Sequence, residues 1–207
     1  MWTLLSLVGL CALQSAFGAV LTVIPDLNLN GDKLKGPAMQ MVVNTDNNVL
    51  KIQFTAPYVQ SDSADNRVHL FLANADHRIT EVEFTPSSST LRLYWAPFNV
   101  LRTVSVDDDP ATFTASTEVG ADKATWTGTA TVAQDLLPPR ISRYNAANVH
   151  PAAAGSSVLQ YDALYAITNY AISVPDLMVL SRYKELGPRF LFNNDGVEYS
   201  KQWQAKN

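Results

Sequence analysis

The stretch Ala-Thr-Trp-Thr-Gly-Thr-Ala-Thr-Val, residues 124–132, alternates between small or apolar side chains and threonines. One side of it carries Trp126, Gly128, Ala130 and Val132, and the other side carries only threonines. A period of two residues indicates a β-strand with one buried face and one face in water. This stretch therefore predicts a strand that covers a hydrophobic core, with Trp126 inside that core.

Four other stretches repeat this alternation, at residues 49–54, 67–73, 79–84 and 90–95. The apolar side of each stretch is expected to face the core. In chain order, these sides consist of Leu50, Ile52 and Phe54 in the first stretch; Val68, Leu70 and Leu72 in the second; Val82 and Phe84 in the third; and Leu91, Leu93 and Trp95 in the fourth. Short connectors rich in Asn, Asp, Ser, Gly and Pro separate the strands. Strands of this length and spacing predict an all-β protein, a single antiparallel β-sandwich or jelly roll with little helix.

Helical signals are few in this chain. Asp135-Leu136-Leu137 stands just before two prolines, so one helical turn is expected there, stopped by the prolines. Residues 176–186 fit a strand or a helix equally well. The sandwich is therefore expected to form without a helical layer.

Composition narrows the class of protein. The chain has 207 residues, a net charge of −4, 47% hydrophobic and 16% charged residues, and one cysteine. It is too apolar for a disordered protein. Its acidity and the lack of a Lys/Arg run argue against nucleic-acid binding. One cysteine supports neither an internal disulfide framework nor a cysteine-based zinc site.

The N-terminus has the features of a secretory signal. Residues 2–17 carry no charge, and the apolar run from Leu4 to Leu13 has the length of a signal h-region of about ten residues, which is too short to span a bilayer. Ala16 and Gly18 supply small residues at a cleavage site. We expect a signal peptide at 1–18 and a sandwich domain at 19–207, secreted and without stable membrane insertion after cleavage.

Six blocks, taken in order, resemble one family of proteins. They are Phe54-Thr55-Ala56-Pro57-Tyr58, Ile79 to Pro86, Trp126-Thr127-Gly128, Leu137-Pro138-Pro139, Tyr144-Asn145-Ala146 with His150, and Tyr161 to Tyr165. The resemblance is to the uncharacterised family that contains the vertebrate chromosome 4 open reading frame 33 protein, and it covers about Leu27 to Phe192. That family in turn looks like the β-sandwich of carbohydrate-binding module family 9. The resemblance implies a fold and no established activity.

One region departs from the family's pattern. Members carry a longer insert with aromatic and acidic residues after the Ala-Pro-aromatic block, whereas this chain has only residues 59–66 there. If that insert builds the ligand site in the family, the site is altered or lost in this chain.

Glu81 and Glu83 fall on the same side of their predicted strand, about 7 Å apart along it. Three interpretations stay open: a solvated face paired with Arg92 of the next strand, a ligand-binding or calcium-binding pair, and the two carboxylates of a glycoside hydrolase. A general acid needs burial to raise its pKa, and the sequence gives no sign of burial here. No catalytic residue is therefore assigned, and a non-enzymatic role is favoured while catalysis stays open.

Aromatic side chains suggest where a sugar could bind, because sugar sites combine flat apolar rings with fixed polar groups. Tyr94 is expected on the polar face of its strand next to Arg92, and Tyr161 and Tyr165 share a face. The expected ligand-binding set is Tyr94, Arg92, Glu81, Glu83, Tyr161 and Tyr165.

The sequence contains few features that indicate a metal site. His69, His77 and His150 show no short metal-binding spacing, and a zinc site would need ligands that converge from separate elements. We therefore expect ordinary surface or capping histidines, with no metal and no cofactor. Asp107, Asp108 and Asp109 offer carboxylates for a structural calcium ion, but calcium needs further ligands from another loop.

These observations lead to one hypothesis and two alternatives. The hypothesis is a secreted, non-enzymatic β-sandwich of uncharacterised role that binds a glycan or another extracellular ligand. The first alternative is a secreted structural or matrix protein that acts through surface contacts. The second, weaker alternative is a glycoside hydrolase that uses Glu81 or Glu83. The sequence leaves the oligomeric state open.

Overall fold

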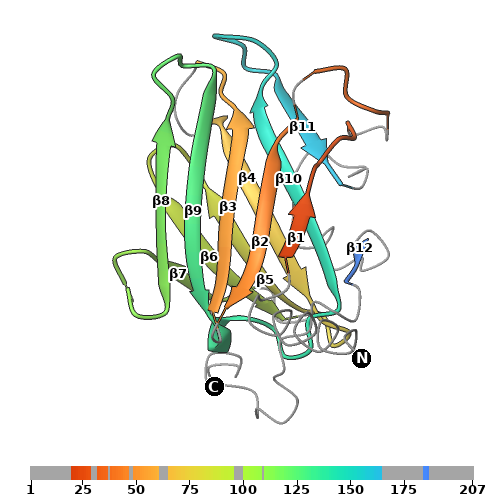
Figure 1. The fold of residues 1–207 in the computed structure, drawn as a ribbon, viewed down its shortest axis with the longest axis vertical. Coiled ribbons are helices and arrows are strands. Elements are labelled where there is room, and N and C mark those ends of the chain that lie inside the picture. The colour runs from red at the N-terminus through yellow and green to blue at the C-terminus, as the bar shows by residue number, and fades with distance from the viewer. Residues whose placement is uncertain are drawn as a thin grey trace, which may run out of the picture.

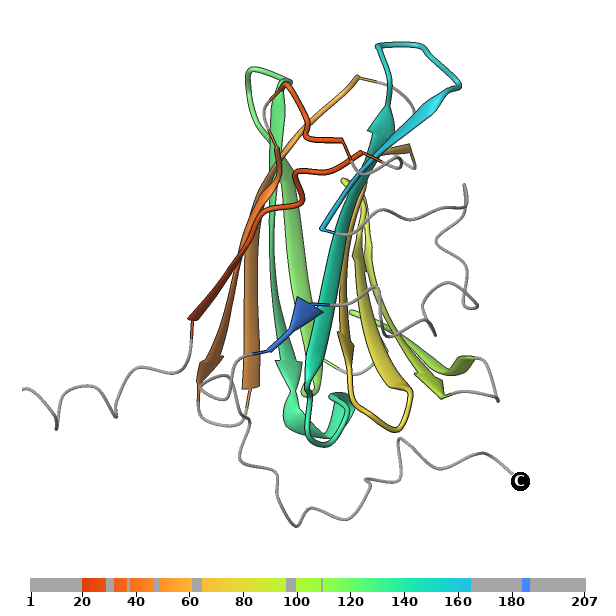
Figure 2. The ribbon, with the colours of Figure 1, turned by 90° about the vertical axis from the view of Figure 1, so that its right-hand side faces the viewer.

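The structure is a computed structural model of the chain. It describes residues 20–28, 32–36, 38–46, 49–60, 65–95, 100–108, 110–164 and 184–186. In this part of the chain two antiparallel sheets lie face to face as two layers (Figures 1 and 2). The predicted all-β antiparallel sandwich is confirmed.

The first layer, called sheet A here, has five strands. Their order across the sheet is β1 (Val20–Val23), β2 (Gln40–Asp46), β3 (Val49–Pro57), β9 (Thr125–Ala133) and β8 (Phe113–Val119). The threonine-rich stretch at residues 124–132 thus falls almost entirely in β9, which pairs with β3 and β8.

The second layer, called sheet B here, has seven strands. Six follow the order β11 (Leu159–Ala163), β10 (Arg143–Pro151), β4 (Arg67–Ala73), β5 (Arg78–Phe84), β6 (Ser89–Trp95) and β7 (Val100–Ser105). The short β12 (Lys184–Glu185) also pairs with β10. Consecutive strands β4 to β7 form a meander, so these four strands lie side by side (Figure 1).

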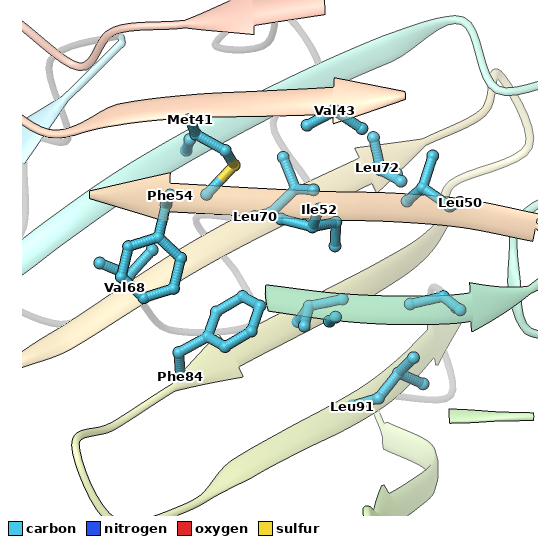
Figure 3. Close-up of a cluster of buried hydrophobic side chains, with 14 of the residues drawn as sticks. Met41, Val43, Leu50, Ile52, Phe54, Val68, Leu70, Leu72, Phe84 and Leu91 are labelled. Carbon is cyan, nitrogen blue, oxygen red and sulfur yellow. The ribbon is translucent and has the colours of Figure 1, made fainter. Parts of the chain in front are cut away.

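The core fills the space between the two sheets. Figure 3 shows Met41 and Phe54 of sheet A directed toward Leu70 and Phe84 of sheet B. The ring of Phe54 meets the rings of Phe84 and Trp126 edge-on, each at a centroid distance of 4.9 Å. The predicted core faces of all five stretches are confirmed, apart from Trp95, because strict alternation aims every second side chain at the opposite sheet.

Trp95 is half-buried rather than a core residue. It lies at the end of β6, where the guanidinium of Arg78 stands 4.2 Å from the centre of its ring. The pairing of β6 with β7 also shifts register between Leu93 and Tyr94. The end of β6 therefore packs on a cation instead of closing the core.

The outer faces of the two sheets differ. On sheet A the outward residues of β3, such as Lys51 and Gln53, are exposed, as predicted. On sheet B, β4 and β10 are buried on both faces: every residue but the first of each strand is buried. The expectation of a solvated outer face on β4, β5 and β6 is therefore wrong for much of this sheet, and polar side chains there must find protein partners.

Several smaller expectations have clear outcomes. The helical turn before the prolines is confirmed as a 3-10 turn at Gln134–Leu136. The proposed signal peptide at 1–18, with Cys11, lies outside the described residues, as do Tyr165, Asp109 and residues 176–183. Of the ambiguous stretch, Lys184–Glu185 is a strand. Within the described ranges, no helix has the length and apolar character needed to cross a membrane.

Candidate functional site

Five polar side chains meet on the outer face of sheet B. Strand register explains the meeting: His69 of β4 is directly opposite Glu83 of β5, and Glu81 of β5 is directly opposite Arg92 of β6. Tyr94 follows two residues after Arg92 and so faces the same way. We call His69, Glu81, Glu83, Arg92 and Tyr94 the outer-face cluster.

Glu81 is at the centre of the outer-face cluster. Its Oε1 lies 2.9 Å from His69 Nδ1. Its Oε2 accepts a hydrogen bond from the hydroxyl of Tyr94 and lies 3.4 Å from Arg92 NH1. Both carboxylate oxygens are thus held by partners from the two neighbouring strands.

Glu83 completes the network from the next outward position of β5. Its Oε1 lies 3.2 Å from Arg92 NH2, and its Oε2 lies 3.7 Å from His69 Nδ1. Arg92 therefore bridges the two carboxylates on one side, and the imidazole of His69 approaches both from the other side. This arrangement is fixed by three strands rather than by loops.

Electrostatics keep Glu81 ionised. Burial alone would raise the pKa of Glu81, but hydrogen bonds from His69 and Tyr94 and the charges of His69 and Arg92 outweigh burial and lower it. For Tyr94, burial and the carboxylate of Glu81 raise the pKa. For Arg92, burial opposes the charged form, yet Glu83 and Glu81 raise the pKa. Arg92 is thus a cation and Tyr94 a hydrogen-bond donor at neutral pH.

Access to the cluster comes from one side. The side chains of His69 and Glu81 are each 5% exposed, whereas those of Glu83 and Arg92 are 17% and 28% exposed. Thr103 of β7 is directly opposite Arg92 and is exposed. A molecule that approaches this face would meet Glu83 and Arg92 first.

The structure brings together four of the six residues expected to bind a ligand: Glu81, Glu83, Arg92 and Tyr94. The expected pairing of the two glutamates with Arg92 is confirmed. Two details are wrong: Glu81 is not a solvated side chain, and Tyr94 is not an exposed platform, because both are buried against each other.

Tyr161 lies apart from the cluster. It is half-buried on the same outer face, but β10 and β4 separate its strand, β11, from β5. Three strand spacings amount to roughly 14 Å, so Tyr161 is too far away to touch the cluster directly. Tyr165, its expected companion, cannot be placed because it is outside the described residues.

His69 is the member that the sequence analysis missed. It was expected at the surface, but it is 4% exposed and packs parallel to the ring of Phe71, 5.7 Å away. A signal was present: Phe71 and Ile79 occupy the supposedly polar faces of β4 and β5. Large apolar residues on that face indicate that the polar residues between them are covered too.

A second polar group lies on the inner face, at the end of the sandwich near β11. His150 Nε2 lies 3.2 Å from Asp162 Oδ2, and Asn148 Nδ2 donates to that same oxygen. His150 Nδ1 lies 2.8 Å from the carbonyl oxygen of Pro151. Burial alone would lower the pKa of His150, but these acceptors, Asp162 above all, raise it. His150 is therefore held between two acceptors, which suits its charged form.

The outer-face cluster contains the residues that could bind a metal ion. Among the residues that the structure describes, the one group of three His, Cys, Asp or Glu side chains that converges closely enough to hold an ion is His69, Glu81 and Glu83, whose ligand atoms lie within 4.8 Å of one another. The aspartates suggested for calcium do not join such a group: Asp107 and Asp108 are exposed, and Asp108 accepts a hydrogen bond from the backbone of Ser105.

Comparisons with known proteins agree with the type of fold. No family model and no curated protein matches the sequence, so the resemblance to the family of the chromosome 4 open reading frame 33 protein stays a prediction. A solved structure from Bacteroides uniformis, described as a "putative carbohydrate-binding protein", matches with a TM-score of 0.53 and 7% identity. The match covers 87% of this chain and 89% of that chain. At this identity the likeness shows the fold alone.

Proposed function

We propose that the chain is a secreted, non-enzymatic β-sandwich module that binds a glycan at the outer-face cluster. The observation that carries the proposal is the convergence of Glu81, Glu83, Arg92 and Tyr94 on one sheet face, fixed by His69 and open at Glu83 and Arg92. The fold neighbour described as carbohydrate-binding adds weight to a sugar as the ligand.

The donors and acceptors at the open side suit sugar hydroxyls. An ionised carboxylate only accepts hydrogen bonds and a guanidinium only donates them, whereas a hydroxyl does both. Glu83 uses one of the roughly four acceptor positions that a carboxylate offers, in its hydrogen bond from Arg92. Neighbouring hydroxyls of one sugar could therefore bind Glu83 and Arg92 together.

Stability alone gives a weak reason for such a cluster. Burying several charges costs free energy, and hydrophobic residues of similar size often stabilise a protein as well or better. The cluster also lies on the face of sheet B opposite the core, so it plays no part in closing the sandwich. Titratable groups whose pKa values are shifted by burial and by specific charged partners are enriched at functional sites.

The charge state of Glu81 argues against Glu81 as the general acid of a glycoside hydrolase. A glycoside hydrolase needs one carboxyl group whose pKa is raised, so that it can protonate the leaving oxygen. The pKa of Glu81 is lowered by His69, Tyr94 and Arg92, which is the opposite of that requirement. A binding role needs no proton transfer and matches a carboxylate that stays ionised.

A glycan array with the secreted, mature protein tests the proposal. We expect selective binding of one group of glycans, in the presence and in the absence of calcium, and loss of that signal in the Arg92→Ala variant. An array with no signal above background under either condition would refute a glycan-binding function. If the protein instead self-associates or cross-links to matrix proteins without binding any glycan, the structural alternative replaces the proposal.

A further inference from the structure

We propose that His69, Glu81 and Glu83 form a binding site for a divalent transition metal ion, Zn²⁺ foremost, with a fourth position open on the side of Glu83. The proposal does not depend on glycan binding. It concerns the more deeply buried part of the outer-face cluster. Its evidence is the placement of one imidazole nitrogen and two carboxylate oxygens from two neighbouring strands.

The three candidate ligand atoms lie close together, all within 4.8 Å of one another. Zinc bonds of about 2.0–2.2 Å at tetrahedral angles place neighbouring ligand atoms about 3.3–3.6 Å apart. His69 Nδ1 lies 2.9 Å from Glu81 Oε1 and 3.7 Å from Glu83 Oε2, distances on either side of that range. Binding an ion would therefore require the three side chains to adjust around it.

The remaining members of the cluster hold the ligands in this orientation. Tyr94 and Arg92 bind Glu81 Oε2, and Arg92 also binds Glu83 Oε1. These contacts turn the other oxygen of each carboxylate toward His69. Hydrogen bonds to the far side of ligands orient them and tune metal affinity in known metal sites.

Charge and ligand type favour a transition metal over calcium or magnesium. One imidazole and two carboxylates give nitrogen and oxygen donors, which suit Zn²⁺, while Ca²⁺ takes six to eight oxygens. In the bound form, His69 would be a neutral imidazole with its proton on Nε2, and the lone pair of Nδ1 would bind the metal. Three protein ligands leave the fourth position for water or for an oxygen of a bound molecule.

The experiment uses the full-length protein, stripped with a chelator, dialysed and titrated with Zn²⁺, and in parallel with Mg²⁺ and Ca²⁺. We expect one Zn²⁺ per chain by elemental analysis and a rise in Tm with Zn²⁺ that neither Mg²⁺ nor Ca²⁺ reproduces. Glu83→Gln should weaken Zn²⁺ binding at least tenfold, because it removes the most accessible ligand. His77→Asn, in an exposed turn whose positive φ suits asparagine, should bind zinc like the wild type.

Two results would overturn the proposal. One is a wild-type protein that retains no Zn²⁺ and shows no shift in Tm, in which case the cluster is an ion-pair network only. The other is equal zinc affinity in Glu83→Gln and in the wild type. If Glu83→Gln does not fold, the visible absorption spectrum of the wild-type protein with Co²⁺ tests the proposal instead. Intense absorption supports a four-coordinate site, and a spectrum like that of hydrated Co²⁺ contradicts it.

Discussion

His69 Nδ1 and Glu81 Oε1 lie 2.9 Å apart across β4 and β5, and each side chain is only 5% exposed. This pair lies on the face of sheet B that turns away from the core. A buried ionisable pair outside the core costs desolvation without helping the two sheets to pack. Its position beside the more accessible Glu83 and Arg92 is the basis for treating this face as the binding face.

The first prediction concerns Glu81, on which the network converges. Glu81→Gln keeps the shape of the side chain but removes the charge that His69, Arg92 and Tyr94 all face. We expect a loss of about 2–4 kcal/mol in the free energy of unfolding, because a buried charge network loses its centre.

Urea unfolding measures this loss. The matched control is Glu118→Gln, an exposed position on β8 of sheet A, which should change stability by less than about 0.5 kcal/mol. Equal stability of the two variants would show that the interactions of Glu81 contribute nothing to the folded state.

The second prediction concerns the contact between Gly128 and Phe54 in the core. A Cβ atom added at Gly128 would lie 2.6 Å from Phe54 Cζ, and the ring cannot move away because Phe84 and Trp126 hold it. Gly128→Ala should therefore cost about 1–3 kcal/mol through overpacking.

Gly36→Ala is the control for this variant, because a Cβ there meets nothing within 4 Å. Thermal unfolding should show a clear fall in Tm for Gly128→Ala and little change for Gly36→Ala. An unchanged Tm in Gly128→Ala would mean that the ring of Phe54 does not lie against Gly128 as described.

The third prediction concerns pH and His150. Its pKa is raised in the folded protein, so the stabilisation it supplies is present below the ordinary histidine pKa of about 6.5 and is lost as pH rises through the raised value. We expect the free energy of unfolding to fall through this group as the pH rises above about 6.5. His150→Gln should remove that part of the pH dependence, because the pair with Asp162 no longer titrates.

Unfolding in urea at several pH values measures the slope. His77→Asn, which changes an exposed histidine, should keep the wild-type slope. A His150→Gln protein with the same slope as the wild type would contradict the assignment of the pH dependence to His150.

The core-facing half of each strand could be predicted from the sequence, and the outer face of sheet B could not. Alternation in β3 and β9 identifies the side chains that face the core, because one face of these strands is in water. On β4 and β5 the same alternation sets polar His69 and Glu81 apart from the core but cannot show that they are buried. Their burial depends on the register between β5 and β6, because β6 supplies Arg92. The register between two strands cannot be read from the sequence of either strand alone.

The central claim is that a glycan binds at the outer-face cluster, and its most direct test is the dissociation constant of the best glycan from the array. Arg92→Lys keeps the positive charge but loses the fork that bridges Glu81 and Glu83. We predict a dissociation constant raised by about 10- to 100-fold, the loss expected when a charge-assisted pair of hydrogen bonds is removed. Arg140→Lys, at an exposed position outside the cluster, should bind like the wild type. Equal affinity in Arg92→Lys and the wild type would contradict the claim.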